Sequence, residues 1–486
     1  GPSQDTRAVG YSRLMVWPSS PPDDADRLSY ADATPLPFWL DRARPEPRPP
    51  VSGDVRADLI VVGGGLTGLW AAVRARQEMP DLDVVLIEGE SIGSGASGRN
   101  GGFMSSSLVH GIGNGLARFP GEVAKLEELG LENLAAIKSS VEAAGIECDL
   151  TSPGAVETAM TGHQFEELGE AVGELEQYGH EAELLDEEAM RSQLDSPLFT
   201  GGLWQKSGEC LIDPVKLCDG LARLAEDLGV RIHESTLMTG YEESDGGVVV
   251  ATSDGRISAS QVLLATAAFH SPVRAIRRRV VPVFDYVLMS EPLTPAQWES
   301  IGWDNRQGFS DSANQFHYYR PTADGRILWG GYDAVYNYGG RVEEGYYQRD
   351  ESFAGLAHRF FAAFPQLEGL RFSHRWGGAI DTCSRFFAFY GTSRGGRVGW
   401  AVGHTGLGVG ASRFAAGVGL DLLYDRDSPV AGTDYLRSLP MPFPPEPLRW
   451  GAIQLTRNRI AAADRKGGRR GVWLKTLDRL GLGFDS

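Results

Sequence analysis

The sequence predicts a mixed fold, α/β with further α+β parts, that opens with a parallel strand–helix–strand unit. Residues 57–62 and 83–88 are short apolar runs without polar alternation, which is typical of strands buried on both faces. Residues 66–77 between them have the pattern of a helix, and a glycine-rich turn precedes it. The chain has 486 residues, which is long enough for two or three domains.

The remaining segments alternate between helical and β-rich patterns. Residues 1–55 are rich in proline and predict an extended arm, although the stretch PLPFWL is apolar enough to dock on the protein. A hairpin is predicted with its turn at 253–255. The other expected elements are mainly helical sequence at 121–195, a helix and a strand within 215–238, a buried strand at 261–265, β-rich sequence at 280–335, helices near 351–364 and at 408–424, and a strand at 397–403.

Residues 431–486 form a C-terminal arm with a basic cluster, DRKGGRRGVWLKTLDRLG. One interpretation is a helix that lies on a membrane surface. The other is an arm that packs back on its own domain. We favour the packed arm because Asp478 and Gly481 interrupt the amphipathic face. Its expected buried stripe consists of Trp473, Leu474, Leu477 and Leu480.

Composition excludes several classes of function. The net charge of −18 argues against a nucleic-acid partner, because phosphate contacts need a basic face. No apolar run is long enough to predict a transmembrane segment. The four cysteines (Cys148, Cys210, Cys218 and Cys383) form no CxxC pair, so we expect reduced thiols, no metal site and, without a recognisable signal peptide, a cytoplasmic protein.

The turn after the first strand has the spacing GxGxxG at Gly63, Gly65 and Gly68. In a nucleotide-binding unit the first glycine allows the tight turn, the second lets the backbone approach a pyrophosphate, and the third lets helix and strand pack closely. Glu88 ends the next strand and can accept hydrogen bonds from a ribose diol. This context favours a dinucleotide site over a glycine-rich turn in an unrelated sheet.

The stretch after Glu88, GESIGSGASGRNGGF, has almost no bulky side chains. So bare a backbone can lie along an extended cofactor and offer amides to it, which favours FAD over NAD. We expect the flavin end of FAD to lie along residues 97–103, with no room for a Cβ at Gly101 or Gly102. Arg99 is expected to point away from the ring, toward a carboxylate or a cofactor phosphate. Phe103 and Met104 are expected to begin the substrate cavity.

Four motifs in this order, VVGGGLTGLWAA, LIEGESIGSGASGRNGG, IDPVKL and GHTGLGVGASRFAAG, resemble the D-amino-acid oxidase/glycine oxidase superfamily of flavoproteins. Within it, GASGRNGG is typical of the gamma-glutamylputrescine oxidoreductase-like branch. The resemblance covers residues 25–430 approximately. It implies a Rossmann-like FAD-binding domain of the glutathione-reductase type, interleaved with a mixed-sheet substrate domain. It also implies oxidation of a carbon–nitrogen bond.

The resemblance divides the chain into four parts. Residues 1–55 are the N-terminal arm and residues 431–486 the C-terminal arm. Residues 56–120, 205–272 and 372–430 are expected to build the FAD-binding domain. Residues 121–204 and 273–371 are expected to build the substrate domain.

The family pattern also implies the residues that bind FAD. The diphosphate loop matches Gly63, Gly65, Leu66, Thr67 and Gly68, and Glu88 matches the ribose ligand. The second segment matches Ala96, Ser97, Arg99, Asn100, Gly101 and Gly102. Met238 matches the position that clasps the adenine, Ala265 and Thr266 lie near the diphosphate, and Gly378 lies in the RWGGAI segment. The late loop, Gly406, Leu407, Gly408 and Val409, reaches the flavin pyrimidine and starts a helix whose positive end can stabilise anionic reduced flavin.

Three departures from the family pattern matter. Some relatives attach FAD to a cysteine within the segment equivalent to RWGGAI, which has none here, so we expect non-covalent FAD. The stretch GRILWGG lacks the lysine that helps oxygen react in sarcosine-oxidase-like relatives, which leaves oxidase and dehydrogenase both open. Gly410 stands where the same relatives hold the substrate carboxylate with a lysine, which favours an amine over a simple amino acid.

The remaining site candidates each have a structural alternative. His404, Tyr319 and Trp376 are the catalytic candidates, and His317 and Arg320 are substrate-binding candidates on a strand expected to face the cavity. His404 and Arg320 could equally be a hydrogen-bonded histidine and a structural salt bridge. The late loop also fits GxGxxA, but no ribose-reading residue follows it on a strand, so we reject a second dinucleotide site.

Together these features predict an FAD-dependent oxidoreductase that oxidises an amine or amino acid. A hydride passes from the substrate carbon to flavin N5, and the imine is hydrolysed to an aldehyde or keto acid. Molecular oxygen then returns the flavin with formation of hydrogen peroxide. The alternatives are a dehydrogenase that passes electrons to a carrier and a flavin-binding protein without turnover.

Overall fold

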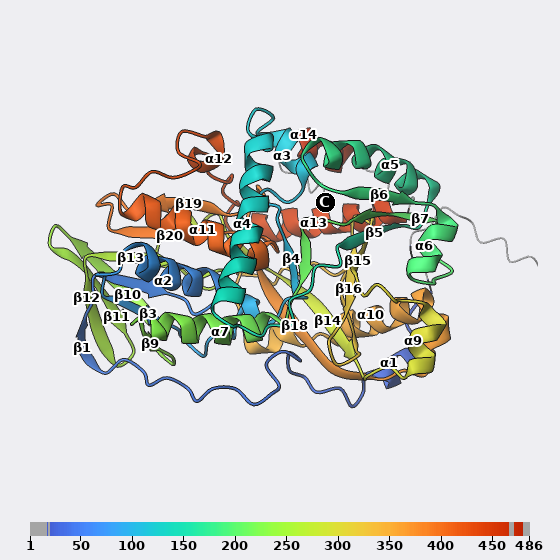
Figure 1. Cartoon of the computed structure of the whole chain (residues 1–486), viewed down its shortest axis with the longest axis horizontal. Coiled ribbons are helices and arrows are strands. Elements are labelled where there is room, and N and C mark those ends of the chain that lie inside the picture. Colours follow the sequence, from blue (N-terminus) through green and yellow to red (C-terminus); the bar gives the residue numbers. More distant parts are fainter. Residues whose placement is uncertain (1–16, 18–19, 466–470, 480–486) are drawn as a thin grey trace, which may run out of the picture.

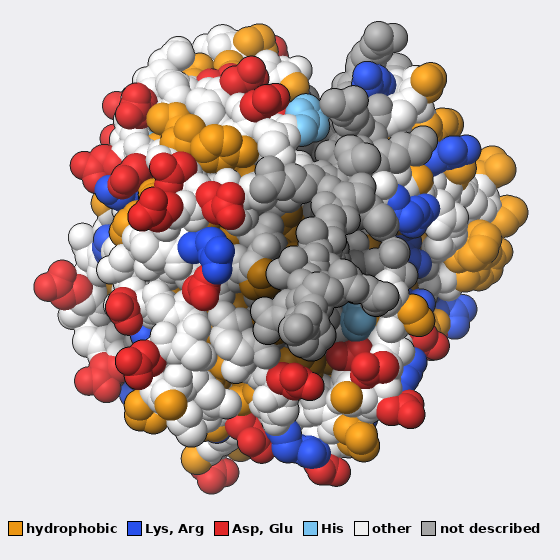
Figure 2. Space-filling model, turned by 90° about the vertical axis from the view of Figure 1, so that its right-hand side faces the viewer, with side chains coloured by type: hydrophobic (Ala, Val, Ile, Leu, Met, Phe, Trp, Pro, Cys, Tyr) orange, Lys and Arg blue, Asp and Glu red, His pale blue; other side chains and the backbone are white. Residues whose placement is uncertain are grey.

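The computed structural model describes residues 17, 20–465 and 471–479, arranged around three main sheets (Figure 1). A six-stranded and a four-stranded sheet lie at one end of the molecule, and an eight-stranded sheet lies at the other. In the described part of the chain, no helix is long and apolar enough to cross a bilayer. Asp and Glu side chains are spread over much of the face in Figure 2, in keeping with the net charge of −18.

The six-stranded sheet contains the predicted strand–helix–strand unit. Its order is β19 (Phe389–Thr392), β20 (Val398–Val402), β13 (Gln261–Leu264), β2 (Leu59–Val62), β3 (Val84–Ile87) and β9 (Arg231–His233). The strands from β20 to β9 are parallel, and β19 is antiparallel to β20. The helices that pack with it are α2 (Leu66–Glu78), α7 (Pro214–Asp227) and α11 (Gly408–Leu423). These elements agree closely with the ranges predicted from the sequence.

The four-stranded sheet contains the predicted hairpin. Its order is β1 (Gly53–Arg56), β12 (Gly255–Ala259), β11 (Gly247–Thr252) and β10 (Met238–Ser244). Strands β11 and β12 are antiparallel around the turn at 253–254, which confirms the hairpin. Its apolar side chains share a core with β2, β3 and β13 of the six-stranded sheet, which we call the nucleotide-type sheet. The four-stranded sheet therefore packs on one face of the nucleotide-type sheet.

The eight-stranded sheet forms the other half. Its order is β18 (Phe372–Thr382), β14 (Val281–Ser290), β17 (Ile327–Gly331), β16 (His317–Pro321), β15 (Gly308–Asp311), β5 (Ala155–Ala159), β7 (Gly201–Gln205) and β6 (Ala182–Leu185). Helices α1 (Asp24–Ser29), α5 (Gly162–Gln177), α6 (Glu187–Gln193), α9 (Pro295–Ile301) and α10 (Asp350–Ala363) surround it (Figure 1). Its sheet is mixed, as the resemblance implied, because β15 and β5 are parallel while the other pairs are antiparallel.

Two segments, β18 and α4 (Val123–Ala143), pack with a different half of the molecule from the one expected from the sequence. Strand β18 begins at 372, where the FAD-binding part was expected to resume, but it pairs along its length with β14 in the eight-stranded sheet. Helix α4 was expected in the substrate part. It packs against α11, and its Leu134, Ile137 and Val141 belong to the core beneath the nucleotide-type sheet. Residues 121–195 also contain β5 and β6 between their helices.

Short elements connect the two halves. Strands β4 (Phe103–Ser105) and β8 (Glu209–Leu211) form a two-stranded sheet. Helix α3 (Ile112–Arg118) follows β4 along the chain. The described N-terminal arm docks as expected, because Trp39 is 2% exposed and donates from Nε1 to the carbonyl of Asn100. Helix α8 (Arg274–Arg277) lies between β13 and β14 along the chain, and helix α12 (Asp434–Arg437) follows α11.

The C-terminal arm forms α13 (Leu448–Asp464) and α14 (Val472–Arg479). The arm was expected to pack back on its own domain, and the contacts of its described part lie on the side of the eight-stranded sheet. Asp464 of α13 accepts hydrogen bonds from the backbone amides of Asn314 and Gln315, next to the eight-stranded sheet. Trp473 remains 38% exposed whereas Leu474 is buried, and Leu480 lies outside the described residues.

Candidate active site

The turn from β2 into α2 requires its glycines. Gly63 has φ +115°, and a Cβ there would lie 2.4 Å from the carbonyl oxygen of Ala265. A Cβ on Gly68 would lie 1.9 Å from the carbonyl oxygen of Gly63. Helix α2 can therefore approach β2 closely only with these residues, as the sequence motif predicted.

The amino end of α2 meets the second glycine-rich segment. The hydroxyl of Ser97 accepts a hydrogen bond from the amide of Leu66 at 2.9 Å. Gly65 precedes the helix and has no side chain to cap it, so the first-turn amides face outward toward Ser97. A helix terminus of this kind attracts anionic groups such as a pyrophosphate.

Glu88 lies beside this turn at the end of β3. Its Oε2 accepts from the amide of Gly64 at 2.6 Å, and its Oε1 accepts from the amide of Glu90 at 2.9 Å. Burial raises the pKa of the Glu88 carboxyl, and the two backbone donors oppose that rise. The amide of Thr236 donates to the carbonyl of Glu88, which brings the start of β10 and Met238 near the same edge.

The surroundings of the turn fit an FAD molecule. Thr266 follows β13, next to Gly63, and its Oγ1 is buried with no hydrogen-bond partner among the described residues. Ala267 has φ +46° and lines the large cavity described below. A partnerless hydroxyl, an outward-facing helix terminus and Glu88 provide the groups that a diphosphate and a ribose need.

Asn100 shapes the second segment by its side-chain amide. Its Nδ2 donates to the carbonyls of Ala96 and Ser97 at 3.0 and 2.8 Å, and its Oδ1 accepts from the amide of Gly102 at 2.8 Å. The amide thus closes a short 3₁₀ turn at 96–98 and fixes the backbone that follows. This explains an Asn between glycines without any contact to a ligand.

The glycines of this segment are enclosed by protein atoms. A Cβ on Gly101 would lie 2.7 Å from the ring of Tyr318. Gly102 has φ +74°, and a Cβ there would lie 2.3 Å from the carbonyl oxygen of Ile212. Protein neighbours alone therefore exclude side chains at both positions, where the sequence had suggested the flavin and its ribityl chain as the obstacle.

Arg99 lies on the wall of the cavity described below, and its guanidinium contacts carbonyl oxygens and an aromatic ring instead of an anion. It donates to the carbonyls of Ser94 and Gly377 at 3.0 and 3.3 Å, and its guanidinium lies 3.8 Å from the ring centre of Tyr347. The expected carboxylate or phosphate partner is therefore replaced by carbonyl oxygens and an aromatic face. Trp376 is fully buried and donates to the carbonyl of Arg99, which removes it from the catalytic candidates.

The late glycine loop lies where it was predicted, at the amino end of α11. Gly406 has φ +96°, and Leu407 immediately precedes the helix. His404 bridges this loop to the first one, with Nδ1 3.4 Å from Asp381 Oδ2 and Nε2 3.3 Å from Thr67 Oγ1. Because a carboxylate only accepts, Nδ1 donates to Asp381, and in the neutral ring Nε2 accepts from Thr67.

A cavity of about 930 Å³ brings these segments together with the eight-stranded sheet. Both glycine loops, the second segment and β18 contribute to its wall. The predicted site residues on that wall are Leu66, Thr67, Ala96, Ser97, Arg99, Asn100, Gly101, Phe103, Gly378, His404, Gly406, Leu407, Gly408 and Val409. Its size and composition suit a cofactor ring together with a substrate.

On β16 the predicted side chains lie on the wrong face. Tyr318 lines the cavity, as does Phe316 just before the strand, whereas His317 and Tyr319 are 0% and 1% exposed and pack in the core behind the sheet. Alternate residues of a strand point to opposite faces, so a shift of one residue exchanges the two sets. His317 instead accepts from Arg359 and contacts Asp311 at 3.0 Å, and burial holds its pKa well below the usual value.

Arg320 and Met104 also leave the list of substrate-binding residues. Arg320 is 3% exposed and donates to the carbonyls of Ile212 and Gly102 at 2.6 and 3.0 Å. Burial lowers the pKa of Arg320 to about 10. Met104 is fully buried in the core beneath the nucleotide-type sheet, while its neighbour Phe103 faces the cavity. Arg320 is thus a clamp on the backbone rather than on a substrate carboxylate.

The structure adds a tyrosine–carboxyl pair that sequence reasoning missed. The hydroxyl of Tyr318 donates to Oδ2 of Asp285 at 2.7 Å, and both residues line the cavity. Burial raises the pKa of Asp285 to about 7. A single acidic residue within the apolar strand VPVFDYVLMS was the available signal, because such a residue on a buried strand must face something polar.

Other residues that the sequence analysis missed follow strand β18 or belong to helices α13 and α14. Cys383 lines the cavity, but its thiol donates to the carbonyls of Phe387 and Gly403 at 3.2 and 3.4 Å, and burial raises its pKa. Helices α13 and α14 contribute a whole section of the wall, which includes Arg449, Ile453, Arg457, Ile460, Leu474 and Leu477.

Known proteins match this chain over most of its length. It is 30% identical over 374 residues to gamma-glutamylputrescine oxidoreductase of Escherichia coli, covering 76% of this chain and 84% of that protein. It is 28% identical over 379 residues to the probable oxidoreductase OrdL of Haemophilus influenzae, covering 76% and 83%. The fold matches the crystal structure of glycine oxidase from Geobacillus kaustophilus with a TM-score of 0.65 at 20% identity, covering 79% of this chain and 100% of that one.

A family model matches the part of the chain that contains the two glycine loops and the sheets between them. It runs from residue 58, just before β2, to residue 419, within α11, and ends before α12. Helices α13 and α14, which complete the cavity wall, therefore lie beyond the matched region. The chain belongs to the family described as FAD dependent oxidoreductase (DAO).

Proposed function

We propose that this protein uses non-covalently bound FAD to oxidise a carbon–nitrogen bond of an amine. The observation that carries the proposal is the charge of the cavity wall. Glu157, Glu209 and Asp285 line it, and their side-chain hydrogen bonds in the described structure are to Ser312, Ser105 and Tyr318, with no arginine or lysine among them. Such a wall favours a cationic substrate over a carboxylate.

The arginines on the wall are already engaged. Arg457 donates to Asp333 at 2.9 Å, Arg449 donates to the carbonyl of Pro444, and Arg99 donates to two carbonyls. No lysine is among the described residues that line the cavity. Gly410 offers no substitute, because a Cβ there would lie 1.9 Å from the carbonyl oxygen of Ser105. A carboxylate clamp for a simple amino acid is therefore absent from the described wall.

The chain's residues divide the work between binding and proton transfer. The two glycine loops, Ser97 and Glu88 would hold the cofactor, and the amino end of α11 would lie at its flavin end. When bound, FAD supplies a two-electron acceptor for the hydride on the carbon next to nitrogen. Asp285, with a pKa of about 7, can accept a proton from the substrate ammonium at Oδ1, while Tyr318 holds Oδ2.

The names of similar proteins support a nitrogen-containing substrate. They include gamma-glutamylputrescine oxidoreductase, sarcosine oxidase subunit beta and glycine oxidase. Under this proposal the imine product is hydrolysed to an aldehyde, or to a keto acid from an amino acid. Molecular oxygen is the proposed electron acceptor, with hydrogen peroxide as product. A carrier-dependent dehydrogenase is the second candidate, favoured by the cavity wall without a lysine.

Anaerobic titration of the FAD-loaded protein tests the proposal. Alkylamines and diamines are expected to bleach the visible flavin absorbance more effectively than N-alkyl glycines, imino acids or D-amino acids. Asp285→Asn should slow bleaching near neutral pH without loss of FAD. Peroxide formed in proportion to amine on admitting air supports the oxidase, and bleaching without peroxide supports the dehydrogenase. Failure of every amine to bleach the flavin would contradict the proposal and favour a flavin-binding protein without turnover.

A further inference from the structure

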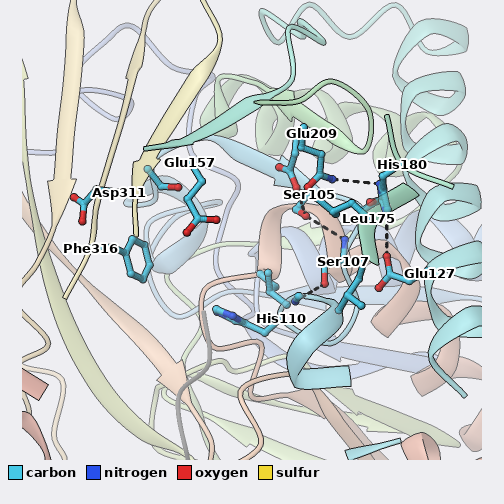
Figure 3. A pocket seen from close by; sticks show the side chains of 16 residues that line it. Ser105, Ser107, His110, Glu127, Glu157, Leu175, His180, Glu209, Asp311 and Phe316 are labelled. Atoms are coloured by element: carbon cyan, nitrogen blue, oxygen red, sulfur yellow. Dashed lines mark hydrogen bonds and ion pairs between the residues drawn. The ribbon is translucent and has the colours of Figure 1, made fainter. Parts of the chain in front are cut away.

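A second chamber of about 290 Å³ adjoins the large cavity (Figure 3). The two spaces share wall residues, among them Glu157, Glu209, Phe316 and Leu407, so they communicate. The chamber lies among the loop after β4, the start of α3, helix α4, and strands β5 and β8. Its volume is close to the lower end of the range for small-molecule sites, which suits one end of a substrate.

Carboxylates from three separate elements line this chamber. Glu127 comes from α4, Glu157 from β5 and Glu209 from β8 (Figure 3). Ser105 donates to one oxygen of Glu209 at 2.5 Å. Asp311 also contributes to the wall, and its side chain accepts a hydrogen bond from the amide of His317. Three carboxylates therefore surround a space that is continuous with the cavity.

The described wall of the chamber supplies no basic side chain of the arginine or lysine type to balance these carboxyl groups. Gln205 donates from Nε2 to Nδ1 of His180 at 3.3 Å, so His180 donates from Nε2 to Glu127 at 2.9 Å and uses both ring nitrogens as a neutral imidazole does. Burial lowers the pKa of His110, the other histidine on the wall. The described wall of the chamber therefore carries carboxyl groups without an arginine or lysine beside them.

One of these carboxylates has an oxygen without a partner. Glu127 is 3% exposed, its Oε2 contacts His180, and its Oε1 has no hydrogen-bond partner in the described structure. A buried oxygen of this kind is costly unless a ligand supplies a donor. Burial also raises the pKa of Glu157 and, to about 7, that of Glu209, which a bound cation would reverse.

A metal ion is a poor candidate for that ligand. Among the described residues, no group of three or more His, Cys, Asp or Glu side chains has the arrangement that could hold one. An ammonium group needs only acceptors at ordinary hydrogen-bond distance, and it can enter from the cavity as part of a longer molecule. Serine hydroxyls at 105–107 add further acceptors to the wall.

We propose that the chamber binds a remote ammonium group of the substrate, so that the enzyme prefers α,ω-diamines or polyamines to monoamines of the same length. This rests on the proposed amine oxidation, and it adds the substrate class. The reacting nitrogen lies in the large cavity near Asp285, and the methylene chain passes Phe316 toward Glu157 and Glu209. A substrate with a carboxylate at its far end meets like charge there and is rejected.

Equilibrium binding to the anaerobic FAD-loaded protein tests this inference. The probes are n-alkylamines, α,ω-diamines and ω-amino acids of matched chain length, measured by calorimetry alongside flavin bleaching. The best diamine should bind at least tenfold more tightly than its n-alkylamine, which corresponds to about 1.4 kcal/mol. The ω-amino acid should bind most weakly. Glu157→Gln and Glu209→Gln should each reduce the diamine preference toward one.

Glu183→Gln is the matched control, because this glutamate on β6 has a half-exposed side chain paired with Lys206 outside the chamber. It should leave the diamine preference unchanged. Equal affinity for diamine and n-alkylamine in the wild type, or a preference that survives both chamber variants, overturns the inference even when amines bleach the flavin. A glutamate-dependent preference without bleaching supports the chamber and contradicts only the proposed oxidation.

Discussion

At Gly101 the second glycine segment meets the pair formed by Tyr318 and Asp285. The tyrosine ring occupies the direction in which a side chain would project, and its hydroxyl positions the carboxyl. Residue 101 therefore controls the geometry of the cavity through Tyr318 as well as through its own place on the wall. Overpacking of this kind costs about 1–3 kcal/mol when the neighbours cannot move freely.

Gly101→Ala should displace Tyr318 and weaken its hydrogen bond to Asp285. We expect a shifted flavin absorption band, lower FAD content and slower anaerobic reduction by amine. Gly113→Ala is the control, because Gly113 lies in α3 with ordinary φ and nothing within 4 Å of an added Cβ. It should behave as wild type. An unchanged spectrum and reduction rate in Gly101→Ala would show that Tyr318 moves without consequence.

At the same scale, sequence predicted steric requirements better than side-chain direction. Gly63, Gly68 and Gly102 were predictable because only a residue without Cβ fits their backbone or neighbours. His317 and Tyr319 were predicted in place of Tyr318 because aromatic residues occupy consecutive positions on β16. When apolar side chains lie on both faces of a strand, the sequence shows that residues alternate between the faces. It does not show which set of alternate residues faces the cavity.

At the scale of elements, helices α13 and α14 form a section of the cavity wall although they lie beyond the region matched by the family model. Arg457 ties α13 to Asp333, and Trp473 of α14 donates to Thr456 of α13 at 3.2 Å. Of the predicted apolar stripe, Leu474 is buried and Trp473 is 38% exposed. The sequence could not predict which surface the stripe covers, because amphipathicity defines a face and not its partner.

Leu474→Ala should open the wall that α14 contributes. Leu474 is 5% exposed and lines the cavity, so we expect KM for amines to rise severalfold and flavin fluorescence to be quenched more readily by iodide, with FAD content unchanged. Val472→Ala, at a position 84% exposed on the same helix, is the control. Identical KM and quenching in the two variants would contradict a lining role for α14.

Strands were predicted well where burial is complete and poorly where it is not. Strands β2, β3, β13 and β20 are buried along their length and were evident as apolar runs. Strand β6, with the pattern AELL, is partly exposed and lies among helices, so its sequence resembled its surroundings. Local pattern is a weak guide when tertiary pairing decides the state.

For the molecule as a whole, FAD bound in the cavity is expected to stabilise the folded state. A ligand that binds only the folded state raises the free energy of unfolding by about 2.7 kcal/mol at a hundredfold excess over Kd. We expect acid precipitation to leave a colourless pellet and intact FAD in solution, and readdition of FAD to raise Tm. Colour retained on the pellet would indicate attachment, with Cys383 on the cavity wall as the first position to examine.

The path of the chain limits how such an enzyme can admit its substrate. In the described structure it passes four times between the six-stranded and eight-stranded sheets, from β3 to β5, β7 to β9, β13 to β14 and β18 to β19. Asp381, at the end of β18, also accepts from the amides of Gly403 and His404 beyond β20. Moving the two halves of the molecule apart would bend all four connections at once. Helices α13 and α14 line the cavity and belong to none of these four connections, so we expect substrate to enter beside them.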